Sequence, residues 1–245
     1  MSANLTTPTV ALAIGAHPDD VEFGCGATLA KWAKAGCVVH HLICTDGSKG
    51  SWDPTADVAE LVIMRQAEQR AAAQALGATG ECVFLRWADG ELDSGLRQRW
   101  EVAYWIRRLQ PRVVLGHDPW KRYRLHPDHR HAGLLACEGI VAARDPHFFP
   151  EQALAHHRPD TLLLFEADEP DHVEDVGGFA DAKLAALHSH TSQLRSTMHI
   201  DAAASPDEIE RQRWAFDDRT RAKLAADGAL EGIAEGEAFK LITNL

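Results

Sequence analysis

Two short clusters of imidazole and carboxylate side chains carry most of the chemistry that this chain could perform. The tripeptide His-Pro-Asp occurs at residues 17–19 and again at 126–128, and each copy is followed by another candidate ligand, Asp20 or His129. Histidine and aspartate are typical zinc ligands in hydrolytic sites, where three protein donors leave one coordination position open. The two clusters therefore predict one catalytic metal site assembled from two distant segments.

The surroundings of the clusters indicate where they lie in the fold. The first follows the apolar run at residues 10–14, and the second follows Val113-Val114-Leu115 after a ten-residue loop. Proline is favoured at the first position of a helix, so Pro18 and Pro127 each predict a helix start. Open α/β sheets collect their reactive groups beyond the carboxyl ends of the strands. We therefore expect both clusters at the same edge of one sheet.

The spacing within the clusters leaves the individual roles open. On the opening turn of a helix, His17 and Asp20 are three residues apart and can point the same way. Asp19 lies about a hundred degrees away around the helix, so it need not bind the same ion. An acidic residue in a first turn can also serve only to complement the helix dipole. Spacing alone does not decide between Asp19 and Asp20, or between His126 and His129, as ligands.

The elements that must position these residues alternate between strand and helix patterns. Strands are predicted at residues 9–15, 37–44, 82–85, 112–116 and 161–166, and helices at 22–35, 57–76, 94–109, 127–143, 179–191 and from Ser205 onward. Residues 238–242 are interpreted as an edge strand or a short packing tail. This alternation predicts a three-layer α/β/α Rossmann-like sandwich with a mainly parallel sheet.

The glycines near the first cluster do not form a nucleotide-binding loop. Gly24-Cys25-Gly26 begins like the dinucleotide fingerprint, but Leu29 replaces its third glycine. We instead expect these glycines to let a helix approach the sheet closely. No Pro/Gly/Ser-rich linker divides the chain, so residues 1–245 are predicted to form a single domain.

Composition excludes several classes of partner. The chain has 25 Lys and Arg residues against 36 Asp and Glu, a net charge of −11, which disfavours nucleic acid and anionic membranes. No run approaches the ~18 apolar residues that span a bilayer, and the N-terminus lacks the pattern of a signal peptide. The five cysteines are scattered singly, which argues against a disulfide framework or a thiolate zinc site. A reducing cytoplasm is the expected compartment.

The segments His17-Pro18-Asp19-Asp20 and His126-Pro127-Asp128-His129 resemble those of the LmbE-like, or PIG-L-type, N-acetylglucosaminyl deacetylase superfamily. The similarity in layout covers about residues 8–195, which leaves residues 196–245 as a C-terminal helical extension and tail. The resemblance implies one zinc ion, with Fe²⁺ as the alternative metal. It also implies hydrolysis of the acetamide of an N-acetylglucosamine-containing molecule to acetate and a free amine.

The resemblance also assigns roles that spacing left open. The metal ligands are then His17, Asp20 and His129. Asp19 is the general base, and His126 supports the oxyanion as an imidazolium, with Asp128 behind it. Zinc makes hydroxide available at neutral pH because it lowers the pKa of water from 15.7 towards roughly 7. Arg65 and Asp89 match positions that hold sugar hydroxyls in related enzymes.

These patterns favour a zinc-dependent N-deacetylase acting on a small aminosugar conjugate. One alternative is an amidase that cleaves a larger thiol or glycoside conjugate. Another is a sugar- or nucleotide-binding module without catalysis, which would have no need of a base at Asp19. A structural zinc scaffold is disfavoured because the chain offers no thiolate ligands. The sequence is compatible with a homo-oligomer and leaves the exact sugar undetermined.

Overall fold

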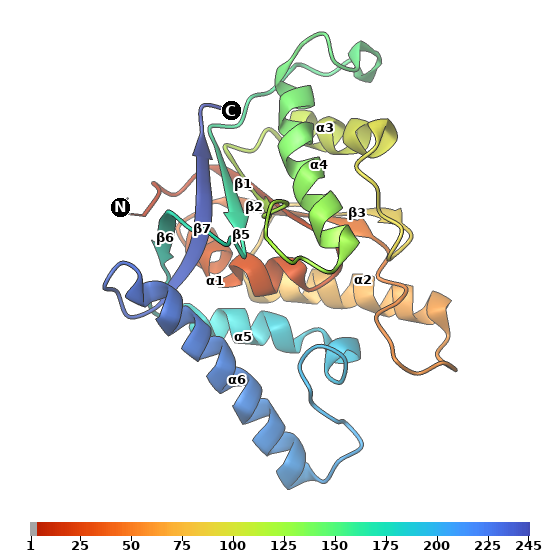
Figure 1. Cartoon of the computed structure of the whole chain (residues 1–245), viewed down its shortest axis with the longest axis vertical. Coiled ribbons are helices and arrows are strands. Elements are labelled where there is room, and N and C mark those ends of the chain that lie inside the picture. The colour runs from red at the N-terminus through yellow and green to blue at the C-terminus, as the bar shows by residue number, and fades with distance from the viewer. Residues whose placement is uncertain (1–3) are drawn as a thin grey trace.

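A seven-stranded sheet with helices on both faces forms the centre of the protein (Figure 1). The computed structural model describes residues 4–245. The strands lie in the order β3-β2-β1-β4-β5-β7-β6, with β1–β5 parallel and β7 antiparallel to both of its neighbours. Their bounds are β1 Val10–Gly15, β2 Val38–Thr45, β3 Cys82–Trp87, β4 Val113–His117, β5 Thr161–Phe165, β6 His172–Asp175 and β7 Gly236–Thr243. The expected α/β sandwich with a mainly parallel sheet is confirmed.

The helices cover the sheet from two sides, as Figure 1 shows. Their bounds are α1 Asp20–Lys34, α2 Val58–Ala75, α3 Leu96–Leu109, α4 Pro127–Arg144, α5 Ala180–His188 and α6 Pro206–Ala229, with short 3₁₀ turns at Pro150–Gln152 and Thr191–Gln193. Leu12 and Ile14 of β1 pack towards α3 and α4. Ala11 and Ala13 pack towards α1, α2 and α5. Burial on both faces explains why this strand is a continuous apolar run.

Strand β7 lies inside the sheet and not at its edge or in a tail. Leu163 of β5 pairs with Leu241 of β7, and Val173 of β6 pairs with Ala238 on the other side. Phe239 is fully buried. The expectation of an edge strand or packing tail at residues 238–242 is therefore wrong, because the short strand β6, which has no clear apolar pattern, covers the outer side of β7.

The two His-Pro-Asp segments begin their helices differently. Pro127 is the first residue of α4 and follows His126 at the N-cap, as expected. Helix α1 begins at Asp20, with Asp19 at the N-cap, which is two residues after Pro18 and two residues before the predicted helix range of 22–35. The backbone of Asp19 has φ 102° and ψ −27°, which a non-glycine residue rarely adopts and which costs of order 1–3 kcal/mol. The prediction that Pro18 starts the helix is wrong because the chain makes this strained turn first.

Helix α1 is interrupted at Cys25, where φ is −150°. The interruption leaves the amides of Ala27 and Thr28 to donate to the carboxylate of Glu237 on β7, at 3.1 and 2.7 Å. Lys183 Nζ on α5 donates to the same carboxylate at 2.7 Å. Glu237 therefore acts as an N-cap for the second half of α1 and ties that helix to β7 and α5.

One glycine of α1 is required for close packing. A Cβ on Gly24 would lie 2.5 Å from Cδ2 of Phe165, the last residue of β5. This agrees with the expectation that glycines here let the helix approach the sheet. All five cysteines are free, and Cys25, Cys37 and Cys44 are buried. Across residues 4–245, no helix combines the length and apolar character needed to cross a membrane.

Replacing Glu237 with alanine is expected to lower the free energy of unfolding by about 3–5 kcal/mol. The change leaves the buried Lys183 ammonium without its partner, and a broken buried ion pair costs that much. Urea denaturation followed by circular dichroism measures the effect. Glu210→Ala, an exposed change on α6, serves as the control. A loss below ~1 kcal/mol, typical of surface substitutions, would contradict this role of Glu237.

Candidate metal centre

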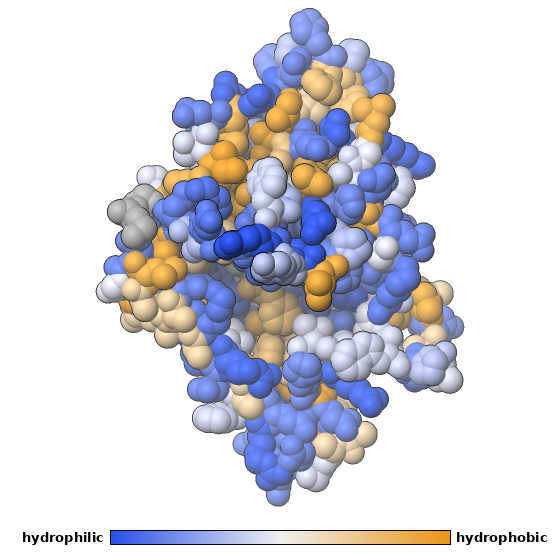
Figure 2. Space-filling view, viewed as in Figure 1, coloured by the Kyte–Doolittle hydropathy of each residue, from blue (hydrophilic) through white to orange (hydrophobic). Residues whose placement is uncertain are grey.

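Three loops that leave the carboxyl edge of the sheet meet around one cavity. The β1–α1 loop supplies His17 and Asp19, the β4–α4 loop supplies His126, and the β3–α3 loop supplies Asp89. The cavity has a volume of about 480 Å³ and is also lined by Lys49, Gly50, Trp52, Arg65, Gln193 and Ser196. The surface is hollowed at the centre of the face in Figure 2, between the main body and the lobe formed by α5 and α6. Neighbouring parallel strands thus bring the two His-Pro-Asp segments together, as the sequence predicts.

The side chains of His17, Asp20 and His129 form a compact donor group. His17 Nδ1 lies 3.3 Å from Asp20 Oδ2, and His129 Nε2 lies 3.3 Å from Asp20 Oδ1. One ligand atom from each of the three residues can be chosen so that all lie within 4.8 Å of one another. Two donors ~2.1 Å from a tetrahedral zinc ion would be separated by about 3.4 Å, so these spacings fit a zinc ion well.

Two other groups of donors overlap this one. The first consists of His17, Asp89, His126 and Asp128, and the second of His117, His129 and Glu166. In the first group, Asp128 already accepts hydrogen bonds from two backbone amides, those of Gly90 at 2.6 Å and Leu92 at 3.2 Å. These two hydrogen bonds hold the Asp128 carboxylate in place whether or not a metal ion is bound.

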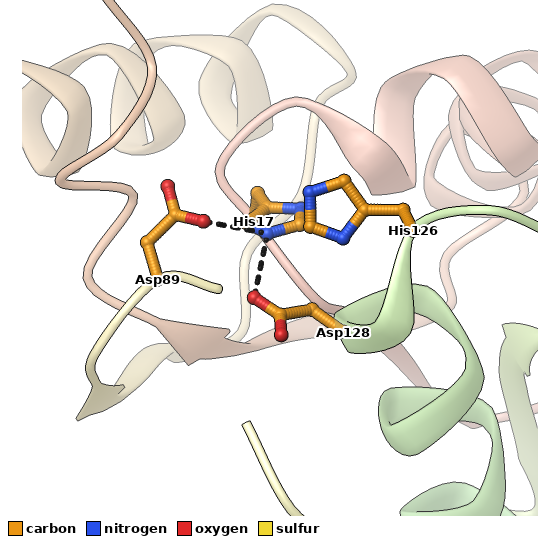
Figure 3. Close-up of side chains that lie close together, drawn as sticks. All are labelled: His17, Asp89, His126 and Asp128. Atoms are coloured by element: carbon orange, nitrogen blue, oxygen red, sulfur yellow. Dashed lines mark hydrogen bonds and ion pairs between the residues drawn. The ribbon is translucent and has the colours of Figure 1, made fainter. Parts of the chain in front are cut away.

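Asp128 contacts His17, which differs from the expected arrangement. Its Oδ2 lies 3.1 Å from His17 Nε2, and its side chain is fully buried. Figure 3 shows Asp89 and Asp128 both bonded to His17, with the His126 ring beside it. A carboxylate on the second nitrogen of a metal-binding imidazole fixes the ring and makes it a better ligand. The position suits Asp128 to orient His17, in addition to its expected influence on His126.

His126 packs among the other imidazoles of the site. Its ring centroid lies 4.6 Å from that of His17 and 4.7 Å from that of His129, with the latter ring stacked at 11°. Burial and the charges of His17 and His129 lower the pKa of His126 below its ordinary value of 6.5. The direction of this shift disfavours an imidazolium, because the neighbouring imidazoles favour the neutral ring, and the charge state of His126 during the reaction stays a prediction.

Asp19 lies beside the donor group in a different environment from Asp20. Burial raises the pKa of its carboxyl from 3.8 to about 6, although the neighbouring Arg65 guanidinium lowers it. Burial also opposes ionisation of Asp20, but the charges of His129 and His117 hold its pKa well below the usual value. The Asp19 amide donates to Gln69 Oε1 at 2.9 Å, which holds the strained turn in place. The pKa values of the two adjacent carboxyl groups are therefore shifted in opposite directions.

The two predicted sugar contacts, Arg65 and Asp89, both line the cavity. Arg65 is buried and donates to the carbonyl oxygens of Pro18 at 2.6 Å and Gly47 at 2.8 Å, with Nη2 3.5 Å from Asp19 Oδ2. Asp89 Oδ1 lies 3.2 Å from His17 Nε2, and its Oδ2 accepts from the amide of Lys49 at 2.9 Å. Each side chain thus also supports the site itself, and its contact with a sugar stays a prediction.

His117 lies outside the two His-Pro-Asp segments in sequence, and the structure places it against the donor group. This residue ends β4, and its Nε2 lies 3.2 Å from Asp20 Oδ2. Its Nδ1 lies 3.3 Å from Glu166, which also accepts from Arg124 Nη1 at 2.7 Å. Burial would raise the pKa of Glu166, but the His117 bond lowers it to about 2. The position of this histidine at the carboxyl end of a central strand is the sequence feature that could have pointed to its place in the site.

Comparison with known proteins gives the family. The model of the PIG-L family, GlcNAc-PI de-N-acetylase, matches residues 12–139. The diacetylchitobiose deacetylase of Thermococcus kodakarensis is 35% identical over 186 residues, which cover 75% of this chain and 69% of the relative. The chain belongs to the PIG-L family. It is therefore a member of a family of N-deacetylases, enzymes that hydrolyse amides, and not of the non-catalytic class considered above.

Other PIG-L relatives and solved structures extend the match over nearly the whole chain. The 1D-myo-inositol 2-acetamido-2-deoxy-α-D-glucopyranoside deacetylase of Actinosynnema mirum is 30% identical, covering 78% of this chain and 82% of that protein. The N,N'-diacetylchitobiose deacetylase of Pyrococcus horikoshii superposes with a TM-score of 0.83 at 28% identity, covering 96% and 84% of the two chains. A 4-carboxy-2-hydroxymuconate hydratase of Pseudomonas putida shares the fold at 21% identity and a TM-score of 0.76, over 97% of each chain. The fold alone therefore does not fix the reaction.

Replacing Asp128 with asparagine is expected to weaken metal binding by about 10–100-fold, because the substitution removes the carboxylate that orients His17. Titration of the metal-free protein with zinc, followed by calorimetry, measures the change. His131→Ala, three residues further along α4 and outside the cavity lining, should bind zinc normally. Normal zinc affinity in Asp128→Asn combined with lost turnover would instead place its action on His126.

Proposed function

We propose that the protein is a zinc-dependent hydrolase that removes the N-acetyl group from an N-acetylglucosamine-type conjugate, releasing acetate and a free amine. The observation that carries the proposal is the contrast between adjacent carboxylates. Asp20 lies within the compact donor group, whereas Asp19 faces the same cavity with a pKa raised to about 6. A base of this strength, separate from the ligands, suits proton transfer at neutral pH.

The donor chemistry supports His17, Asp20 and His129 as the residues that hold the metal. Two imidazoles and one carboxylate form a typical ligand set of hydrolytic zinc sites, with Fe²⁺ as the alternative ion. When bound there, zinc supplies an activated water and polarises the acetyl carbonyl. The nearby Asp89 and Asp128 would then support the site as hydrogen-bond acceptors of His17.

Side chains of the protein carry out the proton transfers and stabilise the oxyanion. Asp19 accepts the proton of the attacking water as the new carbon–oxygen bond forms, and returns it to the sugar nitrogen as the carbon–nitrogen bond breaks. His126, as a neutral imidazole, donates a hydrogen bond to the oxyanion that develops on the acetyl carbonyl. A neutral ring can serve as such a donor when its surroundings disfavour the imidazolium. The products are acetate and the free amine, and together they contain all the atoms of the attacking water.

The names of two relatives support the substrate class. The deacetylases of Thermococcus kodakarensis and Actinosynnema mirum are named for diacetylchitobiose and for an inositol glycoside of N-acetylglucosamine. The part common to both is a 2-acetamido sugar joined to another group. We assign that shared part to this protein, with Arg65 and Asp89 holding its hydroxyls at the cavity wall.

Replacing Asp19 with asparagine is expected to reduce turnover by about 10²–10⁴-fold while zinc still binds, because the base is lost and the donor group is kept. The assay incubates the zinc-loaded protein with diacetylchitobiose and other N-acetylglucosaminides and measures free amine. Asp218→Asn, an exposed change on α6, is the control and should leave turnover unchanged. No amine from any substrate with the unaltered protein, or equal rates for Asp19→Asn, would contradict the proposal.

The rate of deacetylation is expected to rise as the pH increases through about 6. Asp19 works as a base only when ionised, and its pKa in the fold is raised to about 6, so activity is lost as the pH falls below that value. Because the pKa of His126 is lowered, its deprotonation should not limit the rate between pH 7 and pH 9. Measurements of kcat/KM against pH test both statements. A rate that is flat from pH 5 to pH 7 would contradict the role of Asp19.

A further inference from the structure

A second pocket opens beside the main cavity and is not used by the chemistry described above. It has a volume of about 280 Å³ and lies between α1, α5, α6 and the segment around residue 197. Phe23 and Thr197 line both this pocket and the main cavity, so the two spaces adjoin. Phe23 lies three residues after Asp20 in α1. A molecule bound with its acetamide at the donor group could therefore extend into this second space.

The charged side chains that line the second pocket are all basic. They are Lys183, Arg219 and Lys223, joined by His199. The other lining residues are aromatic rings and threonines, so the lining contains no carboxylate among the described residues. This is a marked local reversal in a chain whose net charge is −11. A basic pocket in an acidic protein favours an anionic ligand.

Arg219 is the cation that remains available for such a ligand. Lys183 is paired with Glu237, and Lys223 is paired with Asp227. Arg219 donates to the carbonyl oxygen of Met198 at 3.3 Å, and among residues 4–245 it has no acidic partner. Asp217, two residues before Arg219 on α6, is bonded to His188 of α5 at 2.7 Å. The guanidinium can therefore present two parallel donors to a carboxylate or a phosphate.

The pocket also offers an apolar wall. Phe23 and Phe216 meet edge to face, with their ring centroids 6.2 Å apart. Phe216 is buried and part of a small core cluster with Leu187 and Met198, so this wall is fixed by packing. Together with Arg219, it suits a group with a flat or hydrocarbon body and an anionic end.

We propose that this pocket is the subsite for the group attached to the aminosugar, and that this group carries a carboxylate or a phosphate. The inference rests on the proposed deacetylase function and makes it more specific. It distinguishes the substrate from neutral oligosaccharides such as diacetylchitobiose, because a neutral second sugar leaves Arg219 without an anionic partner. Arg219 is thus a specificity-determining residue that lies outside the catalytic machinery.

The test compares matched glycosides of N-acetylglucosamine. The 4-carboxyphenyl and 4-carbamoylphenyl glycosides have nearly the same shape and differ in charge, and the methyl glycoside lacks the group altogether. We expect kcat/KM for the carboxyl compound to exceed that for the carbamoyl compound by about fivefold, the size expected of one solvent-accessible charge pair, mainly through a lower KM. A 4-phosphonophenyl glycoside distinguishes preference for a phosphate-type group from preference for a carboxylate.

Variants on α6 separate the pocket from general electrostatics. Arg219→Gln should abolish the preference for the anionic glycosides and leave kcat/KM for the methyl glycoside unchanged. Arg213→Gln removes the same charge from an exposed position of α6 outside the pocket lining, and the preference should persist. Equal kcat/KM for the charged and neutral glycosides would overturn the inference, as would a preference that survives in Arg219→Gln.

Failure of the proposed function gives a different result. If no glycoside releases amine, the deacetylase proposal fails, and calorimetric binding of the intact glycosides then tests the subsite alone. Tighter binding of the carboxyl than of the carbamoyl compound, lost in Arg219→Gln and kept in Arg213→Gln, would support the anion subsite. Equal binding of the two compounds would overturn it.

Discussion

The site depends on the adjacency of β1 and β4. These strands are parallel neighbours, with Leu12 paired to Val114 and Ile14 paired to Gly116, so their carboxyl ends lie side by side at the same edge of the sheet. From β1 the chain passes to β2 and β3 on one side of the sheet, and β4 continues it on the other side. Their following loops therefore diverge and leave a crevice between them, as at other switch points of α/β sheets. Each His-Pro-Asp segment occupies one wall of that crevice.

The crevice concentrates negative charge that the protein alone balances poorly. Asp20, Asp89 and Asp128 all approach the imidazoles of His17 or His129 at 3.1–3.3 Å. Buried carboxylates are costly unless paired with positive charge or hydrogen-bond donors. The histidines provide part of this compensation, and the donor geometry suits a divalent cation for the rest. Asp19 lies next to Arg65 but keeps a raised pKa, which is why one carboxylate of the pair stays suited to accept a proton.

Much of this arrangement was accessible from the sequence because strong local signals coincided with it. Continuous apolar runs predicted the central strands, and the paired motifs predicted which loops would meet. The role of Asp128 was harder to predict, because the direction of its side chain depends on the amides of Gly90 and Leu92 from a third loop. The start of α1 at Asp20 was not predicted, because Pro18 alone suggests a helix start, whereas the strained turn at Asp19 depends on a tertiary contact with Gln69. The interior position of β7 depends on pairing between residues about eighty positions apart, for which the sequence carries no local signal.

The reversal of β7 has a consequence for how such enzymes can diversify. Because β7 runs antiparallel to β5, Phe239 in its first half pairs with Phe165, at the end of β5 nearest the reactive crevice. The helix before β7, α6, is thereby delivered to the rim of the crevice even though it supplies no ligand or base. If the proposed subsite on α6 selects the attached group, substitutions in this one helix change the choice of substrate while the loops that carry the His-Pro-Asp segments keep their geometry. The proposed subsite for the attached group is thus built on a different element from the loops that carry the His-Pro-Asp segments.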